Sequence, residues 1–138
     1  MSAAENKRQV QAIFSALAEG KAQPFWDSLS DDVVWTVQGT TSWSGSFAGK
    51  EAVRTQIFKP LREVLDSPPR TRVERILADE DQVVVLGRGD NKTRTGVRYD
   101  NVYCLVFQLA EGRVTKVTEF LDTELMARAL GERPAPTT

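Results

Sequence analysis

The sequence contains no histidine, and this limits the chemistry open to the chain. Ser-His-Asp hydrolysis, Cys-His proteolysis and His-ligated zinc or non-haem iron sites all need an imidazole. Acid–base chemistry must therefore be carried out by carboxylates, tyrosine, lysine or water. Cys104 is the single cysteine, so an internal disulfide is excluded, and we interpret its thiol as a buried, unreactive part of a strand.

Asn101 and Tyr103 are polar side chains whose spacing allows both to contact one ligand. They lie two residues apart in a segment of two-residue apolar period, so they share one face of a strand. An amide and a phenol on one face suit the orientation of a carbonyl or hydroxyl group and the stabilisation of an oxyanion. The structural alternative is that Tyr103 is half-buried core and that Asn101 binds backbone groups.

Asp122 is the candidate for proton transfer. It follows directly after the last expected strand, and a carboxylate at the mouth of an apolar pocket is poorly solvated, which raises its pKa towards neutral pH. The alternative is a helix cap, because a helical segment begins at once after it. Glu119 is a second pocket candidate, but it lies on the opposite sheet face from Asp122 unless a bulge intervenes. Its alternative role is an ion pair with a basic residue of a neighbouring strand.

Aromatic residues are the candidates for the pocket wall. Trp35, Trp43 and Phe14 would offer large flat surfaces, which bind steroid, polyketide or terpene skeletons by burying area without polar cost. We interpret Trp26 as core, whereas Trp43 stands in a loop where exposure or a role as a lid is expected. Arg88 interrupts an apolar strand, so it either faces solvent or reaches an acid in the pocket.

The elements that must position these residues follow from hydrophobic periodicity. Apolar residues at three- and four-residue spacing predict helices over 5–18, 24–29, 50–65 and 123–130, with Pro60 kinking or interrupting the third. β-Branched and alternating residues predict strands over 31–38, 71–78, 82–90, 98–109 and 113–121. Short turns rich in Asp, Asn and Gly join the last four strands, so we expect antiparallel neighbours. The stretch 39–49 is expected to be a loop.

Helices first and a run of strands afterwards indicate an α+β fold. A chain of 138 residues is short for two cores, so we expect one domain over 1–138. In the segment 98–109 both strand faces carry apolar side chains, with Val102, Cys104 and Val106 on the face opposite Tyr103. A sheet that is apolar on both sides must bury both. Helices cover one face, and a second copy of the chain is expected to cover the outer face in a homodimer.

Four motifs carry a resemblance to a known family: DDVVWTVQG at 31–39, GSFAGKEAV at 45–53, NVYCLVFQLAEGRV at 101–114 and EFLDTEL at 119–125. With the order of elements, they resemble the nuclear transport factor 2-like (NTF2-like) superfamily, in its SnoaL-like polyketide cyclase and ketosteroid isomerase-like branch. The resemblance covers nearly the whole chain. It implies a cone-shaped α+β roll of the cystatin-like kind, in which a strongly curved antiparallel sheet carries the N-terminal helices on its concave face around a pocket.

The resemblance also implies a role for Asp122, which stands where SnoaL-like cyclases have their proposed acid/base. The steroid isomerases place an Asp near the end of the first strand and a Tyr on the first helix. The corresponding stretches here read Trp35-Thr36-Val37 and Ile13-Phe14, so that mechanism is not supported.

The function favoured by the sequence is cofactor-independent proton transfer on an apolar cyclic or carbonyl substrate. In this hypothesis the protein is an isomerase or cyclase rather than a lyase or hydrolase; Asp122 moves the proton, and Asn101 and Tyr103 orient the substrate. A non-catalytic binder of a hydrophobic metabolite and a structural dimerisation domain with a closed, dry core are the alternatives.

Charge and hydropathy argue against other partners. Eighteen Lys and Arg against nineteen Asp and Glu leave a net charge of −1, and no Gly-rich phosphate loop is present. We therefore expect neither nucleic acid nor a nucleotide cofactor, and no metal. No apolar run approaches the roughly 20 residues of a membrane-spanning helix, and the first residues do not read as a secretory signal. A cytoplasmic location without membrane association is the expectation.

Overall fold

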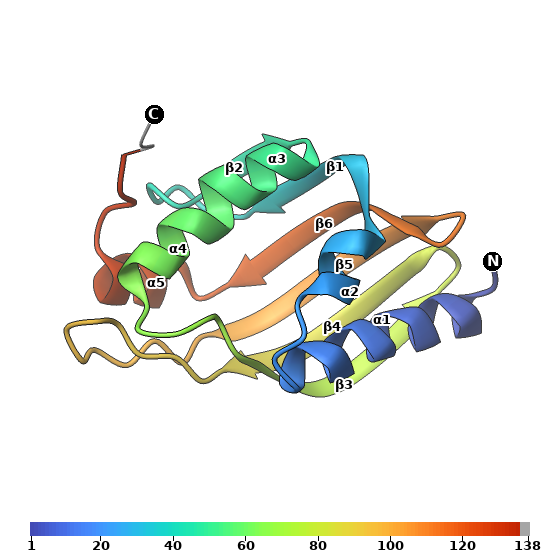
Figure 1. Ribbon diagram of the computed structural model, residues 1–138, viewed down its shortest axis with the longest axis horizontal. Coiled ribbons are helices and arrows are strands. Elements are labelled where there is room, and N and C mark those ends of the chain that lie inside the picture. Colours follow the sequence, from blue (N-terminus) through green and yellow to red (C-terminus); the bar gives the residue numbers. More distant parts are fainter. Residues whose placement is uncertain (136–138) are drawn as a thin grey trace.

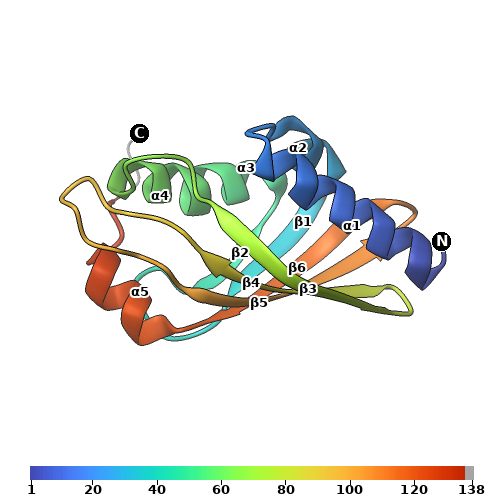
Figure 2. The ribbon, with the colours of Figure 1, turned by 90° about the horizontal axis from the view of Figure 1, so that it is seen from below.

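The computed structural model describes residues 1–135 as one curved, open sheet with helices on its concave side (Figures 1 and 2). The strands are β1 (Leu29–Val37), β2 (Gly45–Ala48), β3 (Thr71–Asp79), β4 (Gln82–Gly89), β5 (Val102–Ala110) and β6 (Arg113–Leu121). The helices are α1 (Ala3–Ala18), α2 (Gln23–Ser28), α3 (Lys50–Val53), α4 (Lys59–Val64) and α5 (Thr123–Leu130), with the π-helical segment η1 (Arg54–Phe58) between α3 and α4. The predicted α+β class is confirmed.

The sheet has the order β2-β1-β6-β5-β4-β3. The antiparallel pairing predicted for the last four strands along the chain is confirmed. One pair departs from the expected antiparallel sheet, because β1 lies parallel to β6. The stretch 39–49 also contains more than a loop, since β2 pairs with β1 and places the buried Phe47 opposite Trp35. That short strand is stabilised by its neighbour rather than by its own Gly- and Ser-rich sequence.

The helix predicted over 50–65 is interrupted just before Pro60, as expected. Proline has no backbone N–H to donate to the carbonyl four residues earlier. The chain widens here into a π turn, in which the Lys59 N–H donates to the Arg54 carbonyl oxygen. The carbonyl oxygen of Gln56, four residues before Pro60, accepts a hydrogen bond from Arg133 Nη1 at 2.8 Å instead. A side chain near the end of the described chain thus completes this helix.

The main core lies between the concave face of the sheet and the first helix. Val10 and Ile13 of α1 are buried against β3 and β4, where Val83 and Val85 are fully buried. Phe107 of β5 and Val117 of β6 continue this inner face towards β1. α1 covers only part of it, so the rest of the concave face needs another cover.

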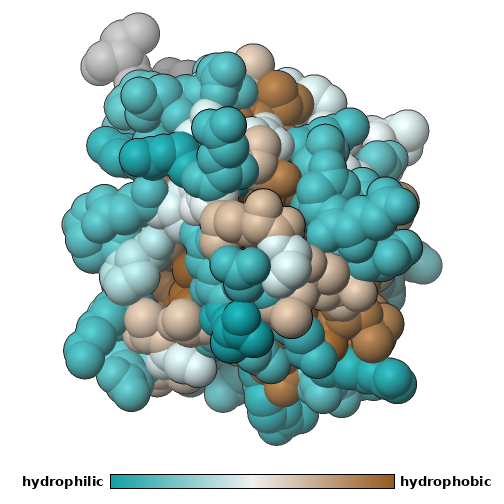
Figure 3. Space-filling view, turned by 90° about the vertical axis from the view of Figure 1, so that its right-hand side faces the viewer, coloured by the Kyte–Doolittle hydropathy of each residue, from teal (hydrophilic) through white to brown (hydrophobic). Residues whose placement is uncertain are grey.

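The outer face of the sheet carries apolar side chains without a covering layer in the described chain. Val102 and Phe120 are 42% and 46% exposed. Cys104, which pairs with Phe120 across the strands, was predicted to be buried but is half-buried. At the end of the molecule that carries the N-terminus, by contrast, the surface is mostly hydrophilic with separate hydrophobic patches (Figure 3). No helix within residues 1–135 has the length and apolar character to cross a membrane.

Candidate functional site

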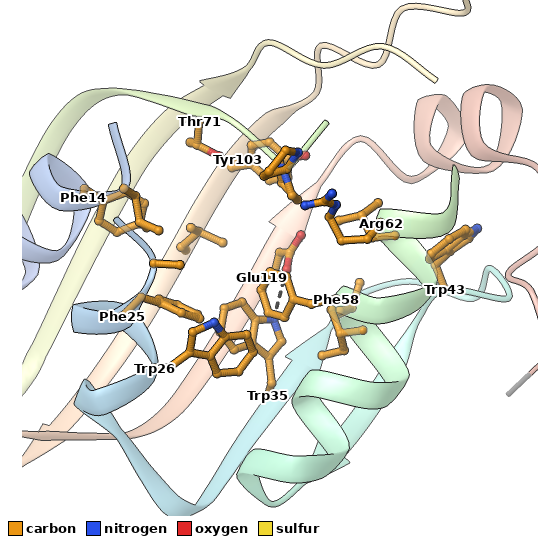
Figure 4. A pocket seen from close by; sticks show the side chains of 18 of the residues that line it. Phe14, Phe25, Trp26, Trp35, Trp43, Phe58, Arg62, Thr71, Tyr103 and Glu119 are labelled. Carbon is orange, nitrogen blue, oxygen red and sulfur yellow. Dashed lines mark hydrogen bonds between the residues drawn. The ribbon is translucent and has the colours of Figure 1, made fainter. Parts of the chain in front are cut away.

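A cavity of about 310 Å³ lies between the inner sheet face and the helices (Figure 4). Its walls come from α1, α2, η1 and α4 on one side and from β1, β5 and β6 on the other. This volume is at the lower end of the range for small-molecule pockets. The alternative of a closed, dry core does not agree with it.

Four interlocked aromatic rings form one end of the pocket. Phe25 and Trp26 of α2, Trp35 of β1 and Phe58 of η1 meet edge to face, with ring centroids 5.1 to 6.0 Å apart. Each edge-to-face contact adds to the stability gained by burial and fixes the angle between two rings. Trp35 lines the cavity. Trp26 was interpreted as core, but it is half-buried and lines the pocket.

Trp43 and Phe14 close other sides of the cavity. Phe14 packs edge to face on Phe107 with centroids 6.0 Å apart, and both rings line the pocket. Trp43 is buried, and its Nε1–H donates to the carbonyl oxygen of Gly131 at 2.7 Å. This bond attaches the ring to the end of α5, so Trp43 is a fixed wall and not an exposed lid.

Glu119 is the carboxyl group that lines the pocket. It lies on β6 opposite Leu105, and its Oε1 accepts a hydrogen bond from Trp35 Nε1 at 3.0 Å. Burial raises the pKa of Glu119 above its ordinary value, and the bond from Trp35 opposes that rise in pKa only in part. The basic residues of the described chain form no ion pair with it, so the structure does not show the alternative role of Glu119 as a surface ion-pair partner.

Two tyrosines of the 99–103 segment stand beside Glu119. Tyr103 is its diagonal neighbour on the inner face, since Tyr103 pairs with Leu121 and Leu105 with Glu119. Tyr99 also lines the pocket, and its hydroxyl accepts a hydrogen bond from Asn101 Nδ2 at 3.1 Å. Burial raises the pKa of Tyr99 to about 12 and that of Tyr103 well above 10.0. Both phenols therefore keep their protons at neutral pH and can donate hydrogen bonds.

Asn101 does not line the pocket, contrary to its predicted role towards a substrate. It is fully buried between β5 and the junction of β6 with α5. Its Oδ1 accepts from the backbone N–H groups of Val102 and Asp122 at 2.7 and 3.0 Å. Its Nδ2 donates to the Asp122 carbonyl oxygen at 3.0 Å and to the Tyr99 hydroxyl at 3.1 Å. Asn101 thus positions Tyr99 and has no free polar atom for a ligand.

Asp122 is outside the pocket, and the prediction that it moves a proton there is corrected. Its exposed side chain accepts a hydrogen bond from the Leu125 N–H at 3.0 Å, as the N-cap of α5. The unpaired N–H groups at the start of a helix attract a carboxylate, and these groups decide where Asp122 points. Glu119, and not Asp122, faces the cavity.

Replacing Asp122 with Ala is expected to lower the free energy of unfolding by about 0.5–2 kcal/mol, the usual contribution of an N-cap. The affinity for pocket ligands is expected to stay unchanged, because the carboxylate caps the exposed start of α5 and does not line the cavity. Urea denaturation and calorimetric titration measure the two effects. A loss of ligand affinity at unchanged stability would contradict this assignment.

Arg88 is also outside the pocket. It lies on the outer face of β4, where its Nε is 3.3 Å from Glu74 Oε1 on β3 and its side chain is 55% exposed. Of its two predicted alternatives, the solvent-facing one holds. No group of three or more potential metal ligands gathers within residues 1–135.

Several pocket residues were missed by the sequence reasoning. Phe58 and Arg62 belong to the segment 50–65, whose apolar spacing predicted only a helix that packs on the sheet. Tyr99 belongs to the strand expected over 98–109 but was not among the site candidates. Its four-residue separation from Tyr103 was the available signal.

Comparison with known proteins identifies relatives by fold. The model of the SnoaL-like domain matches residues 10–117. An NTF2-like protein of unknown function from Burkholderia pseudomallei is similar, with a TM-score of 0.80, 19% identity, and coverage of 91% of this chain and 97% of that one.

A putative SnoaL-like polyketide cyclase from Jannaschia sp. has a TM-score of 0.74 and 18% identity, over 95% of this chain and 94% of its own. An LEH-like epoxide hydrolase from M. tuberculosis has a TM-score of 0.70 and 22% identity, over 93% and 90%. No curated protein matches the sequence. The neighbours share the fold of this chain, and the family model covers most of its residues; the chain belongs to the SnoaL-like domain family.

Proposed function

We propose that this protein binds a mostly apolar, ring-containing small molecule and moves a proton on it with Glu119. The observation that carries the proposal is the position of this carboxyl group, which lies in an aromatic pocket where burial raises its pKa. A carboxyl group with a raised pKa exchanges protons near neutral pH more effectively than a solvated one. A cyclase and an epoxide hydrolase among the neighbours suggest that this fold accommodates such chemistry.

The roles of the individual groups follow from their bonds. Glu119 Oε1 is held by Trp35, while the described chain provides no hydrogen bond to Oε2. Oε2 takes a proton from a carbon next to a carbonyl group, and the carboxylic acid so formed returns the proton to another carbon. Tyr103, which keeps its proton at neutral pH, donates a hydrogen bond to the oxygen on which negative charge develops. Tyr99 forms the neighbouring part of the wall, and Asn101 positions it.

The proposal can be tested without the natural substrate. 2-Tetralone is a bicyclic ketone with acidic protons beside its carbonyl, and proton abstraction in D₂O replaces them with deuterium. We expect the protein to accelerate this exchange, as followed by proton NMR. Binding without exchange, measured by quenching of tryptophan fluorescence, would support the non-catalytic binder instead. No binding of 2-tetralone or of other bicyclic ketones would contradict the proposed pocket function.

We also propose that two copies of the chain pair through the outer sheet face. The supporting observation is the exposure of Val102 and Phe120 on neighbouring strands, beside the half-buried Cys104. Burying such side chains against a second copy removes apolar surface from water, which stabilises association by about 25 cal/mol per Å².

Phe120→Lys is expected to convert a dimer into a monomer of 15.4 kDa, because it places a charge in the centre of the interface. Light scattering after size exclusion measures the mass. The matched control is Val97→Lys, which changes an apolar residue of similar exposure, 46%, outside the strands. A wild-type mass of one chain at micromolar concentration, or an equal effect of both variants, would contradict the proposed interface.

A further inference from the structure

Arg62 brings a positive charge to the pocket. The residue lies on α4 and is exposed, and it also lines the cavity. Figure 4 shows the guanidinium on the side of the pocket where Glu119 and Tyr103 lie, away from the Phe25 and Trp26 rings. Among the described lining residues it is the one cation, as Glu119 is the one carboxyl group.

The neighbouring arginines have partners, whereas Arg62 has none among residues 1–135. Arg54 stacks on Trp26 with its guanidinium carbon 5.2 Å from the ring centroid. Arg94 donates from Nη2 to the Arg62 carbonyl oxygen at 3.0 Å and from Nε to the Glu63 carbonyl oxygen at 2.9 Å. These bonds fix the end of α4. The guanidinium of Arg62 itself has no hydrogen bond, ion pair or ring contact to any residue from 1 to 135.

Arg62 and Tyr103 supply hydrogen-bond donors on this side of the pocket. A guanidinium offers five N–H donors and no acceptor, and the protonated Tyr103 phenol adds an O–H. Arg62 and Glu119 form no ion pair, since no oxygen–nitrogen contact within 4.0 Å joins them in the described chain. The pocket thus has a positively charged side with hydrogen-bond donors and an aromatic end. Such a pocket is complementary to a flat molecule with an anionic oxygen at one end.

We propose that the ligand of this pocket is a ring compound with an ionised oxygen group, a carboxylate or an acidic enol, which binds Arg62 and Tyr103. The inference rests on the proposed function, since the same cavity holds the ring system. The planar guanidinium fork matches two oxygens side by side, while the ring lies against the Trp35 and Phe58 end of the cavity. Arg62 is thus a specificity-determining residue for the acidic end of the ligand.

Two matched pairs of probes test the inference by calorimetric titration. 2-Naphthoate and 2-naphthamide have nearly the same shape and differ in charge. 2-Hydroxy-1,4-naphthoquinone, an acidic enol, and its methyl ether differ in the same way. We expect the wild-type protein to bind at least one anion about tenfold more tightly than its neutral partner. The probe pair that shows this preference for the anion indicates whether the pocket prefers a carboxylate or an enolate.

The Arg62→Gln variant is expected to lose this preference, while its affinity for the neutral probes stays within about twofold of the wild type. Arg62→Lys should keep part of the preference, since it keeps the charge but not the planar fork. The control is Arg128→Gln, which removes an exposed cation that pairs with Glu124 outside the pocket and should keep the full preference.

The possible failures are distinguishable. Equal binding of the charged and neutral probes to the wild type, or a preference that survives in Arg62→Gln, overturns the inference and leaves the proposed pocket function intact. An equal loss of preference in Arg128→Gln overturns it too, because the preference would then come from net charge. Absence of binding by all four probes overturns both the inference and the proposed function.

Discussion

Replacement of Glu119 with Gln is expected to slow deuterium exchange into 2-tetralone by about 100-fold or more, the usual contribution of a positioned acid or base. Glutamine has nearly the same shape, and its Oε1 can still accept the hydrogen bond from Trp35 Nε1. The variant therefore keeps the pocket wall and loses only the group that takes up the proton. NMR integration of the exchanging protons measures the rate, and fluorescence quenching shows whether the ketone still binds.

The matched control is Asp122→Asn, the same carboxyl-to-amide change outside the pocket. Asparagine caps helices about as well as aspartate, so this variant should keep both stability and exchange rate. If Asp122→Asn abolished exchange and Glu119→Gln did not, the assignment of the acid/base would be reversed.

The pH profile of the wild-type exchange gives an independent readout of the same group. Abstraction requires the carboxylate form, so the rate should rise as Glu119 loses its proton and should then level off. Because burial raises the pKa of Glu119, the midpoint of the rise is expected above 4.5, the ordinary value. A rate already constant from below that pH would contradict Glu119 as the base.

Replacement of Asn101 with Ala is expected to lower the free energy of unfolding by about 3 kcal/mol, more than loss of the α5 cap in Asp122→Ala. The substitution leaves the N–H groups of Val102 and Asp122 and the Asp122 carbonyl oxygen without their partner. It also opens a cavity at a fully buried position. Urea denaturation of the wild type and both alanine variants gives the comparison.

A loss no larger than that of Asp122→Ala would show that the Asn101 bonds do not hold β5 to the end of β6. The position of Tyr99 offers a second measurement, since its hydroxyl receives a hydrogen bond from Asn101 Nδ2. The crystal structure of the variant should show the Tyr99 ring displaced from the pocket wall. An unchanged ring would mean that packing alone positions it.

The fold limits the possible functions less than the side chains do. Neighbours with almost the same architecture include a putative SnoaL-like polyketide cyclase and an LEH-like epoxide hydrolase, at 18% and 22% identity. At such identities only the fold is shared, and each chemistry depends on the groups that face the cavity. In this chain those groups are Glu119, Tyr103 and Arg62, and they are the ones that the proposed experiments address.

The sequence alone predicted most of the helices and strands, because their signals are local. Apolar residues three and four apart marked α1 and α5, and alternation marked β3 to β6. The missing N–H of Pro60 predicted the interruption that the π turn realises. The parallel pairing of β1 with β6 and the strand β2 were not predicted, because pairing between distant segments leaves no local pattern in either of them.

The candidate site, too, could be predicted from the sequence only in part. The two-residue period already determined that Glu119 and Asp122 lie on opposite faces. Which of them faces the pocket depends on the register that sets Glu119 beside Leu105, and on the helix start that binds Asp122. Arg62 and Phe58 come to the pocket only because α4 and η1, which carry them, pack across the sheet. The spacing at which side chains return to one face is set by their own strand or helix. The groups that surround a side chain come from segments far away in the chain, and only the tertiary structure brings those segments together.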